Sequence, residues 1–138
     1  MYGALDISTS GMIAQRTRLE AITANIANKD AILNSRGEYS PYQRRRVEFA
    51  PGDPSAKTVA GREMGVHVAA IESEPDSLRP RWDPSSPYAD SSGNVMVPDI
   101  NPVIEYTNAM EASRAYEANV VAAETTKSMM AQALRLIA

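Results

Sequence analysis

The chain has 138 residues, with 14 basic and 17 acidic side chains and a net charge of −3. This balance lacks the concentrated positive charge that nucleic-acid binding needs, so it argues against that function. Hydrophobic residues make up 43% of the chain, but Phe and Trp occur once each, and we do not expect one large apolar core. Cysteine is absent, which excludes disulfides and thiolate metal sites. No apolar run approaches the roughly 20 residues of a membrane-spanning helix.

Residues 4–28 carry the first helical pattern. Apolar side chains recur there every seven residues, at Leu5, Met12, Leu19 and Ile26, and Ile22 adds a second position. This spacing is typical of the contact stripe of a coiled coil. Gly11 costs about 1 kcal/mol in a helix interior, so we expect the segment to be weak alone.

The middle of the chain, residues 30–100, has a different texture, because all nine prolines lie between Pro41 and Pro102. Alternating side chains predict strands at Gln43–Phe49 and Gly65–Ile71, and Val95–Val97 follows a Ser-Gly-Asn turn signal as a third short strand. The stretch Glu72–Gly93 contains four prolines and is predicted to be a long loop. We therefore expect a small β-rich insertion with a marginal core of its own.

The last helical pattern runs over residues 103–138. Asn101 is a plausible N-cap and Pro102 fits the first helical position. A seven-residue row again follows, at Tyr116, Ala123, Met130 and Ile137, with a second row at Val120, Lys127 and Leu134.

These elements predict a mainly α protein with a small β-rich insertion. We expect an N-terminal axial helix (1–29) and a C-terminal axial helix (101–138), packed together as a coiled-coil-like pair around an irregular and β middle segment (30–100).

Several motifs are specific. Ala4–Met12 (ALDISTSGM) followed by Asn25–Asn28 (NIAN) resembles the N-terminal signature of bacterial flagellar rod and hook proteins. Ser113–Asn119 (SRAYEAN) is similar to the closing helix of the rod proteins. In the middle, Gly37–Phe49 and Asp83–Asp90 resemble segments of a proximal-rod subtype within the flagellar basal-body rod protein family.

The resemblance implies a structural subunit that polymerises head-to-tail into the proximal rod of the flagellar drive shaft and transmits motor torque. Such proteins cross to the periplasmic space through the flagellar type III export apparatus without a cleaved signal peptide. The implied partners are further copies of the chain, other rod proteins and the MS ring at the rod base. No cofactor, nucleic acid or direct lipid contact is expected.

The seven-residue spacing leads to the hypothesis of an assembly seam on the two helices. Its expected members are Leu5, Met12, Leu19, Ile22, Asn25, Ile26, Asn28, Tyr116, Asn119, Val120, Met130, Leu134 and Ile137. The alternative is a helical hairpin that buries the same stripes within one chain. The asparagines, with Asn108, are either hydrogen-bonded between helices, which fixes register, or serve as solvated residues and caps.

The only basic run is Arg44–Arg46, with Tyr39 and Tyr42 nearby. It fits a solvated strand edge or an inter-subunit contact with acids of the next subunit better than a nucleic-acid site. One histidine, His67, and no phosphate-binding loop argue against an enzyme. Membrane binding by the helices is disfavoured, because a basic polar face is expected for it and the last helix carries acids instead.

Overall fold

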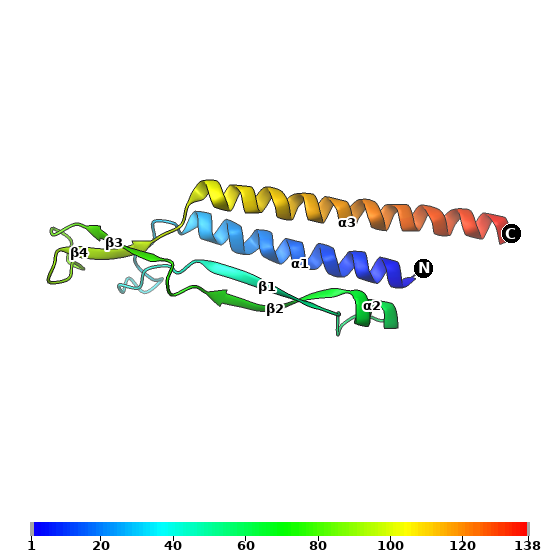
Figure 1. Ribbon diagram of the computed structural model, residues 1–138, viewed down its shortest axis with the longest axis horizontal. Helices are drawn as coiled ribbons and strands as arrows, with labels where there is room; N and C mark the ends of the chain where they lie inside the picture. Colours follow the sequence, from blue (N-terminus) through cyan, green and yellow to red (C-terminus); the bar gives the residue numbers. More distant parts are fainter. Residues whose placement is uncertain (1, 138) are drawn as a thin grey trace.

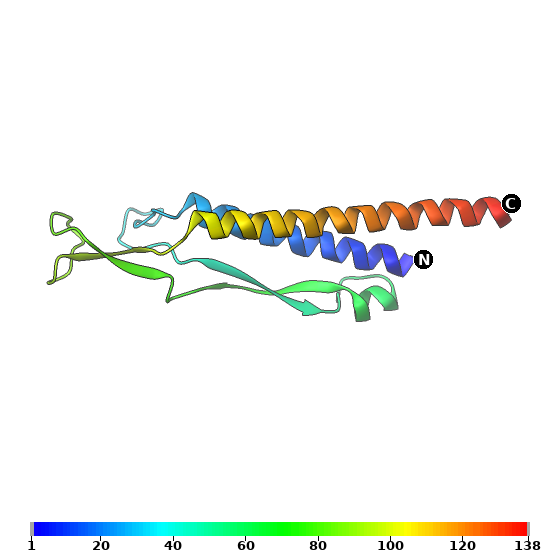
Figure 2. The ribbon, with the colours of Figure 1, turned by 45° about the horizontal axis from the view of Figure 1, so that its top comes forward.

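The computed structural model describes residues 2–137. In chain order its elements are α1 (Tyr2–Ala27), β1 (Arg45–Pro51), α2 (Val59–Met64), β2 (Val66–Ser73), β3 (Leu78–Trp82), β4 (Asn94–Pro98) and α3 (Pro102–Ile137). The helix α1 lies in the middle of three layers, with α3 on one side and the β1–β2 ribbon and α2 on the other (Figure 1). The turned view in Figure 2 shows the same neighbours around α1. The predicted class, mainly α with a small β insertion and paired terminal helices, is confirmed.

The two long helices run antiparallel, and α3 is longer, with 36 residues against 26 in α1. Gly11 lies against Asn119, and Asn25 against Glu105. Tyr2 therefore lies level with about residue 128 of α3, since both helices rise by about 1.5 Å per residue. We call residues 130–137 the overhang, because they extend past the start of α1 (Figure 1).

Small side chains dominate the contacts of α1. Its buried residues are Ser8, Ser10, Gly11, Ala14, Ala21, Ile22 and Asn25. A Cβ atom at Gly11 would lie 2.6 Å from Asn119 Oδ1, so any larger residue there would have to displace the Asn119 side chain. The residue that weakens an isolated helix thus permits the packing of the pair.

Polar side chains near the start of α1 hold the middle segment. Asp6 Oδ2 accepts hydrogen bonds from the Thr58 hydroxyl at 2.6 Å and from the Thr58 backbone N–H at 3.1 Å. Thr58 is in turn the N-cap of α2. Ser10 Oγ accepts a hydrogen bond from Val66 N, at the first residue of β2. These bonds fasten α2 and one end of the ribbon to α1.

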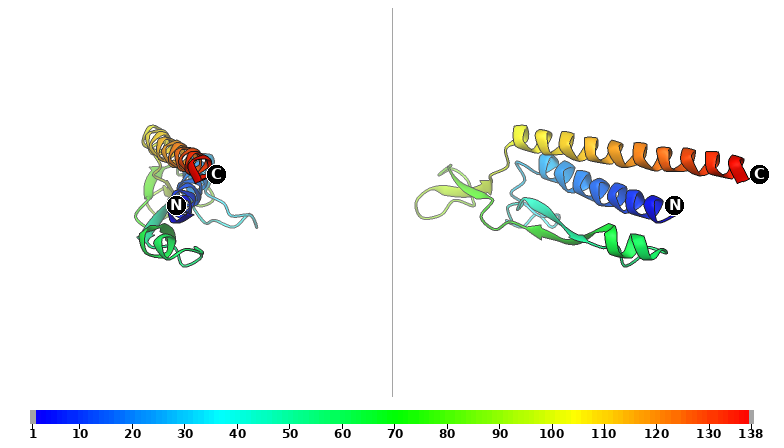
Figure 3. Two further views of the ribbon diagram at one scale, coloured as in Figure 1. Left: turned by 90° about the vertical axis from the view of Figure 1, so that its right-hand side faces the viewer. Right: turned by 45° about the vertical axis from the view of Figure 1, so that its right-hand side comes forward.

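The sheets are two separate antiparallel pairs. The ribbon pairs β1 with β2, from Arg45 opposite Ser73 to Pro51 opposite Val66, and its register shifts between Glu48 and Phe49, where Ala69 of β2 has no partner. The second pair, β3 with β4, forms an arm (residues 78–98) that projects beyond the helices at the end away from both termini (Figure 3).

The predicted strands Gln43–Phe49, Gly65–Ile71 and Val95–Val97 correspond to β1, β2 and β4, with bounds shifted by up to two residues. The helix bounds shift similarly, and Ala138 lies outside the described residues. The N-cap at Asn101 is confirmed, because its Oδ1 accepts a hydrogen bond from Val103 N at 2.9 Å. The six-residue helix α2 was not predicted, since it is too short for a periodic pattern.

The prediction of a long loop over Glu72–Gly93 is wrong, because β3 lies within it. In the sequence, Pro80 argues against a strand, because a proline cannot donate a ladder hydrogen bond. In the structure, Pro80 lies opposite Met96 of β4. Met96 N and O both bond the Tyr39 hydroxyl at 3.0 Å and so point away from β3. In such a non-hydrogen-bonded pair, Pro80 has no ladder hydrogen bond to lose.

Candidate assembly surfaces and the polar hub

The α1–α3 contact follows a seven-residue repeat, but not the predicted apolar rows. On α3 the row facing α1 is Glu105, Ala112, Asn119 and Thr126, all buried or half-buried. On α1, Gly11 and Asn25 face this row. The sequence reasoning placed large apolar side chains in the contact, whereas the chain fills it with small and polar ones.

The predicted α1 residues flank this contact. Ile22 and Asn25 are buried, with 6% and 1% of their surface exposed. The remaining five are half-buried: Leu5, Met12, Leu19, Ile26 and Asn28. Asn28 donates to the carbonyl of Ala24 in its own helix. The stripe is therefore partly open to a neighbour.

The predicted α3 residues divide along the helix. Asn119, Val120 and Met130 are half-buried, and Tyr116 is just exposed. Asn119 donates to Ala115 O in its own helix. Leu134 and Ile137 belong to the overhang and are 67% and 84% exposed.

The large apolar side chains of α3 lie mostly outside. Besides the overhang, they are Val103, Ile104, Tyr106, Met110, Val121 and Met129, each more than half exposed. We call these six residues and Leu134, Leu136 and Ile137 the open apolar surface. A helical hairpin does form within one chain. Its fully buried side chains are mostly small or polar, with Ile22 as the large exception, and most large apolar side chains of α3 stay uncovered. Exposed apolar surface of this extent marks interaction sites.

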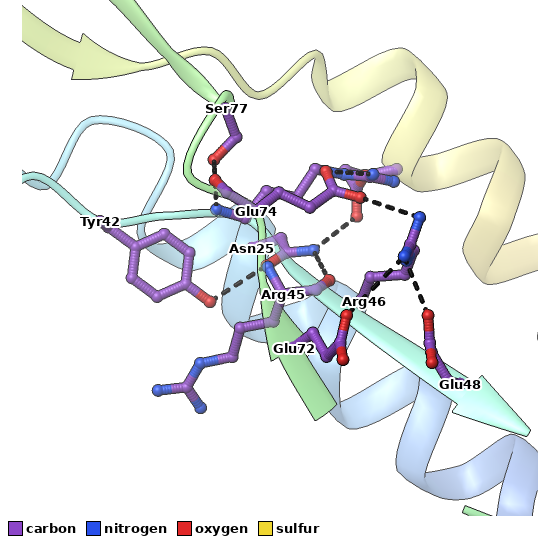
Figure 4. Close-up of polar contacts among 10 residues, drawn as sticks. Asn25, Tyr42, Arg45, Arg46, Glu48, Glu72, Glu74 and Ser77 are labelled. Atoms are coloured by element: carbon purple, nitrogen blue, oxygen red, sulfur yellow. Dashed lines mark hydrogen bonds and ion pairs between the residues drawn. The ribbon is translucent and has the colours of Figure 1, made fainter. Parts of the chain in front are cut away.

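Several polar residues meet near the start of β1, in a cluster we call the polar hub: Asn25, Tyr42, Arg44, Arg45, Glu74, Ser77 and Glu105. Figure 4 labels Asn25, Tyr42, Arg45, Glu74 and Ser77 among them. The Asn25 amide nitrogen donates to Arg45 O at 2.9 Å and to Glu105 Oε2 at 3.1 Å. Asn25 Oδ1 accepts from Arg45 N at 2.8 Å and from the Tyr42 hydroxyl at 3.0 Å. Both donors and both acceptor positions of the amide are satisfied, which fixes its orientation.

The charged half of the hub centres on Glu105, which is 1% exposed. Arg44 Nε donates to Glu105 Oε1 at 2.8 Å, and Arg44 Nη1 donates to Glu74 Oε2 at 3.1 Å. Arg44 N also donates to Ser77 Oγ at 2.8 Å. Burial disfavours the charge of Arg44, but the hydrogen bonds with Glu105 and Glu74 outweigh it and raise the pKa of the guanidinium. For Tyr42, burial raises the pKa of the phenol, and the positive charge of Arg45 offsets part of this rise.

The other predicted contact residues are also engaged within the chain. Arg46 lies 2.9 Å from Glu48, and Arg45 lies over the Tyr42 ring, 5.8 Å from its centroid. Tyr39 stacks on Tyr88 with ring centroids 5.1 Å apart and bonds Met96 at the arm.

Sequence reasoning missed Glu74, Ser77 and Glu105 as contact residues, and a signal in the sequence was available for Glu105 alone. The available signal was its place in a seven-residue row with Ala112, Asn119 and Thr126. This row is absent from the predicted contact stripes, because those stripes follow apolar residues and the side chains of this row are small or polar.

No group of three or more His, Cys, Asp or Glu side chains among residues 2–137 is placed to hold a metal ion. None of the helices described is long and apolar enough to cross a membrane.

Comparison with known proteins points to one family. Residues 5–30 match the model described as "Flagella basal body rod protein", and residues 91–136 match "Flagellar basal body rod FlgEFG protein C-terminal". The flagellar basal-body rod protein FlgC of Buchnera aphidicola subsp. Acyrthosiphon pisum is 33% identical over 136 residues, covering 99% of this chain and 97% of that protein. FlgC of Bacillus subtilis is 30% identical over 145 residues, covering 98% and 97%. FlgC of Escherichia coli O157:H7 is 39% identical over 142 residues, covering 99% and 97%.

Proposed function

This chain belongs to the family of flagellar basal-body rod proteins, and we propose that it joins the rod through the open apolar surface of its helix pair. Membership makes the chain a structural subunit of the flagellar basal-body rod, which assembles with other rod proteins, and not an enzyme.

We further propose a position for the subunit in the rod and a route by which it arrives there. The chain polymerises head-to-tail into the proximal rod and carries torque, with further copies, other rod proteins and the MS ring as neighbours. It reaches the periplasmic space through the type III export apparatus without a cleaved signal peptide. A contact between two different surfaces of each copy, repeated by a rotation that does not close, produces an open helix of subunits.

One observation carries the proposal: the helix pair keeps small residues inside and large apolar residues outside. Leu134, Leu136 and Ile137 are 67%, 89% and 84% exposed on the overhang. Burying such a side chain contributes about 1.5–3 kcal/mol. Neighbouring subunits that cover the overhang therefore gain several kcal/mol that the single chain forgoes.

The proposed division of labour follows the three segments. The helices of residues 1–29 and 101–138 lie toward the rod axis, and residues 30–100 lie outside them. Within the predicted seam, the half-buried row at Leu5, Met12 and Leu19 and the exposed Leu134 and Ile137 are the residues proposed to touch neighbours. Tyr39, Tyr42 and Arg44 have partners within the chain, so we assign them to holding the middle segment.

The experiment is incorporation of a double variant, Leu134→Ser with Ile137→Ser, into basal bodies of cells that lack the natural protein. We expect the variant to be missing from isolated basal bodies and the cells to be non-motile. Val59→Ser on α2 is the matched control, because Val59 is equally apolar and 59% exposed but lies outside the helix pair. Normal incorporation of the double variant would refute the proposal.

A further inference from the structure

One buried carboxylate joins the three parts of this chain. Glu105, in the first turn of α3, bonds Asn25 of α1, 80 residues away, and Arg44 of the middle segment, 61 residues away. We propose that Glu105 makes the docking of the middle segment depend on the packing of α3 against α1, so that a change at the start of α3 is transmitted to the β1–β2 ribbon.

The link between α3 and the middle segment is narrow. Among the side-chain hydrogen bonds and ion pairs of residues 2–137, only those between Arg44 and Glu105 join α3 to residues 30–100. The ribbon packs on α1 and not on α3 (Figure 1). Apart from the chain connection that leads from β4 into α3, any influence of α3 on the ribbon therefore passes through α1 or through Glu105.

The α1 side of the link is the amide of Asn25. It bonds Arg45 N and O as a neighbouring strand would, at the first residue of β1. Its second N–H points to Glu105. If α3 moves away, this buried N–H loses its acceptor and Arg44 loses one of its two carboxylates, so the start of β1 is held less firmly.

The dependence also runs in the other direction. The Glu105 side chain is 2% exposed, and its ion pair is with Arg44. If the middle segment leaves, a buried carboxylate keeps only a neutral amide as partner, which is a strongly unfavourable state. The two docking events thus favour each other, as coupling between sites must.

Different bonds hold the far end of the ribbon. Asp6 with Thr58, and Ser10 with Val66, connect the middle segment to α1 without α3. The coupling should therefore loosen the ribbon at its Arg45 end while α2 stays in place. It is a property of the single chain and does not depend on the proposed subunit contacts.

The test is hydrogen exchange of the full chain with Glu105→Gln or Glu105→Ala, followed by mass spectrometry. We expect amides at the Arg45–Ser73 end of the ribbon to exchange about 10-fold faster, with little change at the centre of α1 and α3. Glu111→Gln is the matched control. Glu111 is an exposed acid of the same helix that bonds Arg18 of α1 at 3.5 Å and nothing in the middle segment, so both regions should keep their rates.

Arg44→Gln tests the reverse direction. It should speed exchange in the first turn of α3, although Arg44 lies outside that helix. Equal acceleration of the ribbon and the helix centres in all variants would show a general loss of stability and overturn the proposal. Unchanged ribbon exchange would also overturn it, as would a natural chain whose ribbon amides are unprotected.

Discussion

The paired part of α3 and its overhang differ in the size and polarity of the side chains that they present. Where α3 faces α1, the contact is made by Ala112, Asn119 and Thr126 opposite a glycine, and it is complete within one chain. Past the start of α1, the helix presents Leu134, Leu136 and Ile137 to solvent. In the proposed account, the chain folds with its small residues, and neighbouring subunits cover its large ones.

The same substitution, isoleucine to alanine, should affect the free energy of unfolding very differently in the buried contact and on the overhang. Ile22→Ala, in the buried contact, should lower the free energy of unfolding by about 2–5 kcal/mol. Ile137→Ala, on the overhang, should change it by less than about 0.5 kcal/mol. Urea denaturation of the single chain, followed by circular dichroism, measures both, and equal losses would contradict the distinction.

The hub offers the next largest effect. Asn25→Ala removes the partner of the Arg45 backbone N–H and C=O and of the Tyr42 hydroxyl at a partly buried site, and it removes one of the two partners of Glu105, which keeps Arg44. Each unsatisfied group costs about 1–3 kcal/mol, although relaxation recovers part of the total. We expect a loss of about 2–4 kcal/mol in the same denaturation assay. Asn108→Ala is the control, since Asn108 is half-buried on α3 and outside the hub. An equal loss of stability in this variant would show that the hydrogen bonds of the hub contribute no more than an ordinary half-buried asparagine.

Gly11 tests whether the close approach of the helices matters. Gly11→Val places carbon atoms where Asn119 lies, because even a Cβ would be 2.6 Å from its Oδ1. Overpacking of this kind costs about 1–3 kcal/mol. Ala118→Val on the exposed face of α3 is the matched control. A stable Gly11→Val variant would mean that the Asn119 side chain moves aside without loss and that glycine is not needed at this contact.

The smallest effect is a pH dependence. Because burial raises the pKa of Tyr42 above its ordinary value of 10.0, the folded chain favours the protonated phenol. The associated stability is present below the unfolded pKa and is lost as pH rises through the folded one. Between about pH 9 and pH 11 the natural chain should therefore lose more stability than Tyr42→Phe. Denaturation midpoints at the two pH values measure the difference, and identical losses would contradict it.

Much of this fold follows from local patterns. The seven-residue spacing predicted both helices, Asn101 and Pro102 marked the start of α3, and alternation located β1, β2 and β4. Pro80 concealed β3, since a proline is harmless there only because it faces Met96, whose backbone groups bond Tyr39, far away in the chain.

The assembly surfaces were harder to predict for a physical reason. Placing large apolar residues inside is sound for a protein that folds alone, but here Gly11 and Ala112 take that position. The hub was out of reach because its bonds join residues up to 80 positions apart. Glu105 lies in the first turn of α3, and no local pattern links it to Arg44.

Cryo-electron microscopy of isolated basal bodies would show directly which side chains of the subunit its neighbours cover. We predict that each subunit keeps its α1–α3 hairpin, with Asn25 bonded to Glu105, and that neighbouring chains cover Leu134, Leu136 and Ile137 near the rod axis. A map in which these three side chains face solvent, or in which α1 leaves α3 to pair with another subunit, would contradict the account.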